Sequence, residues 1–256
     1  MARVEGKRSS GAFPSSGVVT INRRHADGLI AQGLEAGGHL VGRELALDFL
    51  ARILPLAGKR PVLLAGGIAT GKDARAALDP GASGAVAGTR FMLTHESDAH
   101  RLYQQRVLDA SETLETTVFG LGWPARHRVI PNAATQRWCQ SDGSARSLPT
   151  FVNRASSPLS RVINDGLIAR LPSMQRTWLP LLAPTPPLLG MRDAIVDSTP
   201  LYAGETAYAS RRSSRQKRPL TISPVAPPES DLSDGQDGLV RVLRGAHAIR
   251  QRRRRR

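Results

Sequence analysis

Cysteine, aromatic residues and long apolar runs are all scarce in this sequence. A single cysteine, Cys139, stands among 256 residues, which excludes an internal disulfide and any metal cluster built from the thiolates of one chain. We interpret it as an inert thiol in a reducing compartment. Aromatic residues make up 4% of the chain, which is few for a large buried core. Because there is no run of about 18 apolar residues, and because the polar N-terminus lacks the apolar middle of a signal peptide, no membrane association is predicted and cytoplasm is the expected location.

Acidic residues are also few, and the resulting positive charge is unevenly spread. The chain has 36 Lys and Arg against 21 Asp and Glu, a net charge of +15. Residues 1–140 carry +5 of this charge and the remainder carries +10. The basic clusters within 211–218 and 252–256 could bind a polyanion through phosphate contacts, but no aromatic residue follows Tyr208 to stack on bases. We therefore predict a disordered basic tail over 209–256 and no specific nucleic-acid partner.

Three short apolar runs end in glycine, at 26–39, 60–68 and 81–91. Each lacks the alternation of a half-exposed strand, which indicates strands buried on both faces of a parallel sheet. In parallel α/β folds ligands bind where such strands end, and glycine there lets backbone N–H groups approach an anion. The pairs Gly66-Gly67 and Gly88-Thr89 therefore predict a phosphate-binding site, although ordinary strand-to-helix turns carry similar residues.

Helical patterns separate these runs. The spacing of apolar residues predicts helices over 42–56, 73–78 and 97–110. Strands are expected over 61–64 and 84–86, so the order β-α-β-α-β-α is readable across about ninety residues.

The composition changes on both sides of this patterned part. Residues 1–16 have no periodicity and predict a loose leader, and 17–138 form one α/β domain whose first residues, 17–22, fit a short strand. After Trp138 proline, serine and threonine dominate, so 139–208 is predicted to be an irregular Pro-rich extension.

Three motifs carry a resemblance to a known family. The stretches 32–39 (QGLEAGGH), 61–68 (PVLLAGGI) and 88–97 (GTRFMLTHES) resemble, in order and spacing, the motifs of the nitronate monooxygenase family, formerly called 2-nitropropane dioxygenases. The resemblance implies an FMN-dependent (β/α)8 TIM-type barrel, of which this chain would hold the last three or four βα units. It covers about 18–138, around half the chain. The short stretch 201–205 (LYAGE) is similar to a motif near the family's C-terminus.

An incomplete barrel has a physical consequence. A barrel removes its sheet edges only by closing, so a partial one predicts an open edge through which copies can self-associate. The family's early strands, which supply part of the substrate pocket, have no counterpart here, so the resemblance does not imply that this chain is active alone. A non-catalytic fragment with a polyanion-binding tail is therefore one alternative.

The resemblance also implies a site and a reaction. His39 would act as, or assist, the base that removes the acidic α-proton of a nitroalkane, and imidazole suits that role near neutral pH. Gln32 would hydrogen-bond the flavin ring. Backbone or hydroxyl groups of six further residues would hold the FMN ribityl chain and phosphate: Gly37, Gly66, Gly67, Ala87, Gly88 and Thr89. The reaction would convert a nitronate or nitroalkane and O2 into a carbonyl compound and nitrite. Glu35 is expected to orient the loop or to cap the following turn.

Other interpretations of the same residues remain. A flavin-dependent enoyl-acyl-carrier-protein reductase is similar in fold and in its Gly-Gly-His loop, but an acidic residue would be expected at Gln32. The stretch 66–72 (GGIATGK) fits most of a P-loop, yet Asp73 replaces the Ser or Thr that would bind magnesium. His95 and His100 are five residues apart rather than four, so we predict no metal site and a surface or helix-start role instead.

Overall fold

The structure, a computed structural model, describes residues 28–158 and 174–207. All of these residues belong to one unit of the chain, Val4–Lys217. The predicted leader over 1–16, the strand expected at 17–22 and the basic tail over 209–256 lie outside the described residues. Within them, no helix has the length and apolar character needed to cross a bilayer.

A parallel sheet forms from the three glycine-ended runs. Its strands are β1 (Leu29–Gln32), β3 (Val62–Ala65) and β4 (Gly84–Val86), in the order β1-β3-β4. The register aligns Ala31 with Leu64 and Leu64 with Ala85, so these side chains share one face. The predicted α/β class with a parallel sheet is therefore confirmed.

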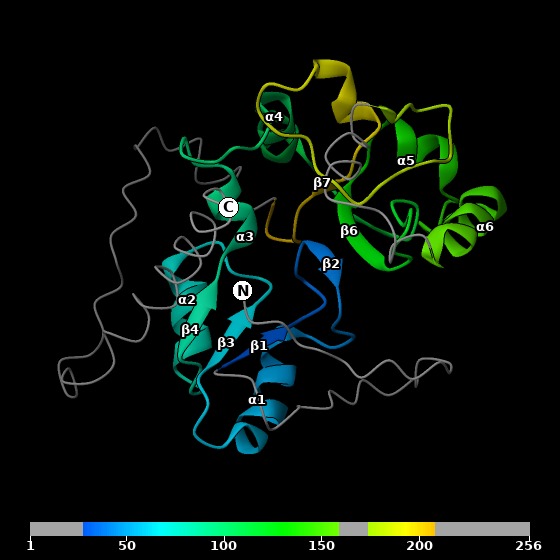
Figure 1. The fold of residues 1–256 in the computed structure, drawn as a ribbon. Coiled ribbons are helices and arrows are strands. Elements are labelled where there is room, and N and C mark those ends of the chain that lie inside the picture. Colours follow the sequence, from blue (N-terminus) through cyan, green and yellow to red (C-terminus); the bar gives the residue numbers. More distant parts are fainter. Residues whose placement is uncertain (1–27, 159–173, 208–256) are drawn as a thin grey trace, which may run out of the picture. The chain divides into compact units, whose positions relative to one another are not determined.

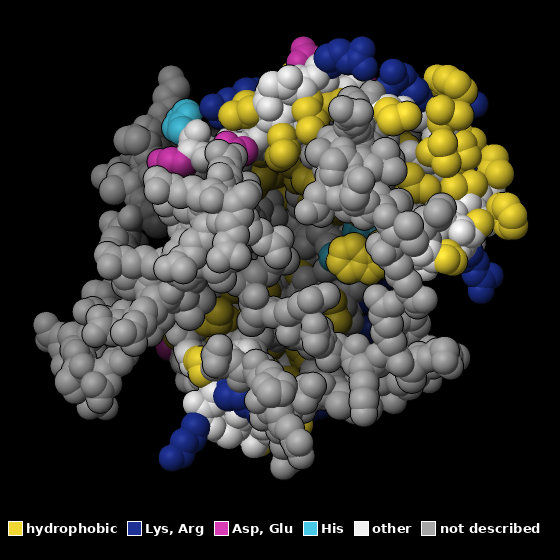
Figure 2. All heavy atoms as spheres, viewed as in Figure 1, with side chains coloured by type: hydrophobic (Ala, Val, Ile, Leu, Met, Phe, Trp, Pro, Cys, Tyr) yellow, Lys and Arg dark blue, Asp and Glu magenta, His cyan; other side chains and the backbone are white. Residues whose placement is uncertain are grey.

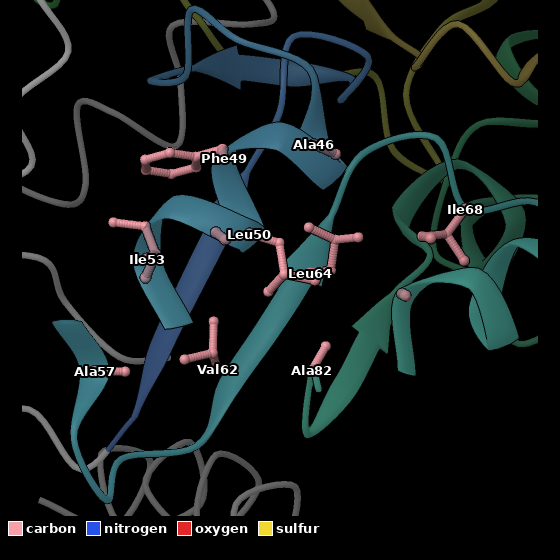
Figure 3. Close-up of a cluster of buried hydrophobic side chains, with 11 residues drawn as sticks. Ala46, Phe49, Leu50, Ile53, Ala57, Val62, Leu64, Ile68 and Ala82 are labelled. Carbon is pink, nitrogen blue, oxygen red and sulfur yellow. The ribbon is translucent and has the colours of Figure 1, made fainter. Parts of the chain in front are cut away.

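Two crossover helices cover that face of the sheet (Figure 1). They are α1 (Ala46–Ala57), which packs on β1 and β3, and α2 (Gly71–Leu78), which packs beside β4. Figure 3 shows Leu50 of α1 directed toward Leu64 of β3, and both side chains are fully buried. Burial of each such leucine contributes about 1.5–3 kcal/mol to folding.

The helix boundaries differ from the prediction for local reasons. Helix α1 begins at Ala46 rather than Gly42, because the Glu35 carboxylate accepts a hydrogen bond from Ala46 N at 2.9 Å. Pro55 lies inside the last turn and does not end this helix, which stops before Gly58. Helix α4 (Arg101–Asp109) begins four residues later than predicted, because His100 caps it with Nδ1 accepting from Leu102 N.

Helix α2 begins with a complete capping box. Thr70 Oγ1 accepts from Asp73 N, while the Asp73 carboxylate accepts from the backbone N–H groups of Ala69 and Thr70. Burial opposes ionisation of Asp73, but these hydrogen bonds and Lys72 outweigh it and lower the pKa of the carboxyl group. Because the folded-state pKa is depressed, the stabilisation is present above the ordinary pKa of 3.8 and is lost as pH falls through the lower folded value.

We expect Thr70→Ala to reduce the free energy of unfolding by about 1 kcal/mol, because one N-terminal N–H of α2 loses its acceptor. Thr70→Ser keeps the hydroxyl and is the matched control. Urea denaturation at pH 7 measures both, and equal losses in the two variants would show that the cap does not stabilise the fold.

A second, antiparallel sheet was not predicted. Its strands are β2 (Gly38–Leu40), β5 (Leu114–Thr116), β6 (Arg126–Ile130) and β7 (Leu201–Tyr202), with β6 pairing all three others. β2 belongs to the first glycine-rich run, yet its partner β6 lies almost ninety residues later in the chain. A pairing between strands so far apart in the sequence leaves no local residue pattern from which so short a strand could be predicted.

The prediction of an irregular extension over 139–208 is wrong in part. Besides β7, the segment contains α6 (Ser147–Ser156) and the 3-10 helix η2 (Asp193–Asp197). Helix α6 escaped prediction because polar residues face inward, with Asn153 donating to Thr117 O at 2.9 Å, while Phe151 is exposed. Short helices α3 (Gly88–Met92) and α5 (Ala133–Trp138) complete the described elements.

Candidate functional site

A hollow of about 300 Å³ opens where the three parallel strands end. Its lining includes Gln32 at the end of β1, Gly66 and Gly67 after β3, and Gly88 and Thr89 after β4. The opposite wall comes from distant parts of the chain: Tyr103 of α4 and the stretch 202–206, of which Tyr202, Gly204 and Thr206 line the hollow. Of the eight site residues predicted from the sequence, the structure brings six to this hollow, and Gly37 is the sixth.

The turn after β3 depends on glycine. Gly66 and Gly67 have φ angles of +114° and +74°, a backbone region in which side chains other than glycine are strained. A Cβ added to Gly67 would meet nothing nearer than Glu35 Cβ, at 3.9 Å. The turn therefore leaves its backbone accessible from the hollow.

The turn after β4 offers a second accessible backbone. An added Cβ at Gly88 would meet no atom within 4 Å, so the space beside it is open. Thr89 Oγ1 accepts a hydrogen bond from Gly204 N at 3.0 Å, which joins this turn to the stretch 202–206. Ala87, predicted to bind the cofactor, is the N-cap of α3 and does not line the hollow.

Gln32 and Glu35 hold the loop between β1 and β2. Gln32 Nε2 donates to His39 O at 2.9 Å, and Gln32 Oε1 accepts from Val41 N at 2.8 Å. The predicted contact of Gln32 with a flavin ring thus competes with two hydrogen bonds to β2 and its continuation, leaving the amide one further donor and one lone pair. Glu35 caps the start of α1 eleven residues later, rather than the turn that directly follows it.

Two tyrosines, Tyr103 of α4 and Tyr202 of β7, form part of the wall of the hollow. Tyr103 is 3% exposed, and its hydroxyl donates to Tyr202 O. The Tyr202 hydroxyl donates to Pro184 O at 3.0 Å. Burial raises the pKa of both phenols well above the ordinary value of 10.0, so both stay protonated and neither is a base at neutral pH.

His39 is not where the sequence predicted it. Its side chain was expected over the cofactor, but His39 does not line the hollow. Gly38, at φ +80°, turns the chain into β2, so the imidazole packs instead against Trp123, with ring centroids 4.1 Å apart. His39 is half-buried, and burial lowers the pKa of its imidazole below the ordinary 6.5.

His127 is a neighbour of His39 that sequence reasoning missed. The two residues are paired between β2 and β6, and their rings meet edge to face at 4.7 Å. His127 is fully buried, and the backbone of Ala125 hydrogen-bonds to its ring. Burial, and secondarily the neighbouring His39, lower the pKa of His127 to about 4, so it is neutral at physiological pH.

Arg128 ties the antiparallel sheet to the loop of the parallel one. Its guanidinium donates to Leu34 O at 3.1 Å and contacts Glu115 and Glu205 at 3.0 and 3.1 Å. The side chain is only 10% exposed. Because Leu34 lies in the loop after β1, this network fixes the position of the hollow's wall.

The structure also bears on the two rejected alternatives. In a P-loop, backbone N–H groups of the glycine-rich turn point at phosphate, but here Ala69 N and Thr70 N donate to the Asp73 carboxylate. His100 caps α4 and lies 3.1 Å from Met191 O through Nε2, as the predicted helix-start role requires. No group of three or more His, Cys, Asp or Glu side chains that could hold a metal occurs within 28–158 and 174–207.

Known proteins resemble this chain over different lengths. Nitronate monooxygenase from Pseudomonas aeruginosa is 45% identical over 87 residues, 31% of this chain and 25% of that protein. The (3aS,4S,5R,7aS)-5-hydroxy-7a-methyl-1-oxo-octahydro-1H-indene-4-carboxyl-CoA dehydrogenase of Mycobacterium tuberculosis is 33% identical over 196 residues, 71% of this chain and 54% of that protein. This chain therefore spans about a quarter to a half of these two relatives.

A solved structure and a family model complete the comparison. The nitroalkane oxidase of Streptomyces ansochromogenes is 28% identical, with a TM-score of 0.46, over 71% of this chain and 46% of that one. The model of the family described as nitronate monooxygenase matches residues 15–208, about three quarters of the sequence. The chain therefore belongs to the nitronate monooxygenase family.

Proposed function

We propose that the hollow at the ends of β1, β3 and β4 binds FMN and that the chain takes part in the oxidation of nitronates or nitroalkanes by O2. Family membership over residues 15–208 is the observation that carries this proposal. Bound FMN would accept electrons from the substrate and pass them to O2. The residues of this chain would bind the cofactor, orient the substrate and move one proton.

The residues around the hollow fit a phosphate-bearing cofactor. Gly67 and Gly88 leave open space where a side chain would stand, so an oxyanion could reach the backbone there. Among the described residues, the only carboxylate that lines the hollow is that of Glu35, and it accepts a hydrogen bond from Ala46 N. At about 300 Å³ the hollow is at the lower end of small-molecule sites, so we expect it to hold the phosphate and ribityl end.

The three parallel strands correspond, in this proposal, to the last part of a (β/α)8 barrel. Their order β1-β3-β4 and the helices α1 and α2 on one face agree with consecutive βα units. Ile30 and Val86, on the other face, are 42% and 37% exposed. That face would lie toward the interior of a complete barrel.

His39 is the base of this proposal. Tyr103 and Tyr202 keep their protons, and Glu35 caps α1, so the ionisable groups of the described lining are unsuited to accept the α-proton. The backbone of His39 lies beside the lining, because Gln32 donates to its carbonyl oxygen, while its imidazole packs on Trp123, so proton removal by His39 requires the ring to turn toward the hollow. Because burial lowers the pKa of its imidazole below 6.5, the ring is neutral and able to accept a proton at neutral pH.

We expect His39→Asn to slow oxidation of neutral nitroethane by about 10²–10⁴-fold, the usual contribution of a general base. Oxidation of the preformed ethyl nitronate, which has already lost that proton, should change by less than about tenfold. Oxygen uptake and nitrite release with both substrates measure the difference. In the unsubstituted chain the rate with nitroethane should fall only below pH 6.5, and His39→Asn should lack this acid limb.

Two outcomes would contradict this assignment. Equal loss with both substrates would show that His39 supports the fold or the cofactor rather than proton removal. An acid limb that persists in His39→Asn would assign the base to another residue. FMN affinity of the variant, measured by flavin fluorescence, serves as the control for binding.

A second candidate is oxidation of an acyl-CoA substrate. The alignment with the Mycobacterium tuberculosis indene-4-carboxyl-CoA dehydrogenase covers 71% of this chain, against 31% for the Pseudomonas aeruginosa nitronate monooxygenase. The alignment with the dehydrogenase spans 196 residues, so it extends well beyond the part of the chain that holds the three glycine-ended strands. Flavin reduction by a cyclic acyl-CoA, with no nitrite from nitroethane, would favour this candidate.

A further inference from the structure

Trp123 is an exposed aromatic side chain that lies against the proposed base. It is 59% exposed, yet its indole packs on the His39 imidazole, with ring centroids 4.1 Å apart and ring planes inclined by 35°. Near the middle of Figure 2 a His side chain is visible beside hydrophobic ones, where Figure 1 shows β2 and β6. Because Trp123 belongs to none of the three buried clusters, its contact with the imidazole can open without disturbing the core.

The position of Trp123 is set by its own loop rather than by the imidazole. Gly122, at φ +73°, donates from its backbone N–H to Ser156 Oγ of α6 at 2.9 Å. Earlier in the same loop, Thr117 O accepts a hydrogen bond from Asn153, also of α6, at 2.9 Å. The loop is therefore anchored on α6 directly before Trp123, so the indole presents a fixed surface.

His39 is connected to the hollow by its backbone and by neighbouring rings. Its carbonyl oxygen accepts from Gln32, which lines the hollow. Its imidazole meets His127, which stacks on Tyr202 with centroids 5.7 Å apart, and Tyr202 also lines the hollow. Trp123 does not line the hollow, so a turn of the imidazole toward the hollow separates it from the indole.

The ionisable groups around the imidazole are neutral or paired. Two neighbouring strands bring four of them near it: Arg126, His127 and Arg128 of β6, and Tyr202 of β7. The two arginines donate to the Glu115 carboxylate, the tyrosine keeps its proton, and the pKa of His127 is about 4. The loop 117–125 contains no ionisable side chain. Burial is therefore what lowers the pKa of His39, and Trp123 supplies part of that burial.

We propose that Trp123 is a positioning residue for His39, which holds the imidazole away from the hollow until the ring turns toward a bound substrate. This inference rests on the proposed function, because it takes His39 as the base. While the two rings are in contact, the indole shields the imidazole from water. Once the contact is broken, the imidazole is hydrated and free to turn. Removing the indole should therefore change both the ionisation of the ring and the fraction of time it faces the hollow.

The ionisation of His39 is measured by NMR titration of the full chain without FMN or substrate, with His39→Asn identifying the resonance. Trp123→Ala should raise the pKa of His39 toward the ordinary 6.5, because the ring loses the side chain that shields it. Trp123→Phe keeps an aromatic ring at this place and should restore the lower value. Trp178, which is 61% exposed, provides the matched control, and Trp178→Ala should leave the pKa of His39 unchanged.

The position of the ring is measured by the rate of nitroethane oxidation with saturating FMN at pH 8, where the imidazole is neutral in every variant. Trp123→Ala should react about two- to tenfold faster than the unsubstituted chain, the factor that one aromatic contact supplies. Oxidation of preformed ethyl nitronate should not change.

Three outcomes would overturn the proposal: an unchanged pKa of His39 in Trp123→Ala, an equal shift in Trp178→Ala, or oxidation of nitroethane by Trp123→Ala that is no faster. Absence of nitrite from the unsubstituted chain would instead contradict the proposed function. In that case the NMR titration still decides whether Trp123 holds the imidazole, because it needs neither cofactor nor substrate.

Discussion

Replacing Arg128 with methionine is expected to lower the free energy of unfolding by about 1.5–3 kcal/mol. Methionine fills most of the same volume but can neither pair with Glu115 and Glu205 nor donate a hydrogen bond to the Leu34 carbonyl oxygen. Arg128 is buried while Glu115 and Glu205 are 32% and 47% exposed, so the expected loss exceeds that of a fully exposed pair but stays below that of a fully buried one. Chemical denaturation at pH 7 measures the change.

Arg126→Met is the matched control for this prediction. Arg126 also pairs with Glu115, at 3.1 Å, but its side chain is 34% exposed, so the expected loss is about 1 kcal/mol or less. A loss in Arg128→Met no larger than in Arg126→Met would show that the buried network does not join the two sheets.

Introducing a carboxylate at Gly88 is expected to weaken FMN binding by about a hundredfold or more, equivalent to about 2.7 kcal/mol. The Cβ meets no atom within 4 Å, so the substitution does not disturb the fold. Its carboxylate would extend into the space proposed for the FMN phosphate and repel it. Flavin fluorescence titration measures the dissociation constant.

Gly88→Ala separates charge from bulk. It adds only the Cβ, and because Gly88 is the first residue of α3, alanine should stabilise the helix slightly and leave FMN binding within about threefold. Equal weakening by alanine and glutamate would mean that the backbone at Gly88, rather than the space beside it, controls binding. Unchanged binding in Gly88→Glu would place the phosphate elsewhere.

Local patterns predicted the parallel sheet and much of the hollow. Runs such as 60–68 are continuous and apolar because β3 is buried between its neighbours, and the glycines follow because the turn at Gly66 and Gly67 needs positive φ angles. Both features depend on residues close together in the sequence. The same holds for His100, whose capping of α4 depends on its position beside the helix.

Long-range pairings could not be predicted. The position of His39 depends on β6, and the wall of the hollow at Gly204 depends on its hydrogen bond to Thr89, 115 residues away. Arg128 and His127 acquire their surroundings only when β6 joins β2 and β5. These strands lack the continuous apolar runs ending in glycine that mark β3 and β4, so they escaped prediction although β4 is just as short.

The central claim is that the glycine-ended strands bind FMN, and direct titration of the purified full chain with FMN tests it most directly. Quenching of flavin fluorescence, followed alongside circular dichroism, should show one equivalent bound with a dissociation constant of about 1 µM, a typical cofactor affinity. Riboflavin, which lacks the phosphate, should bind at least about tenfold more weakly. A folded chain that shows no saturable binding, or that binds riboflavin equally well, would contradict the claim.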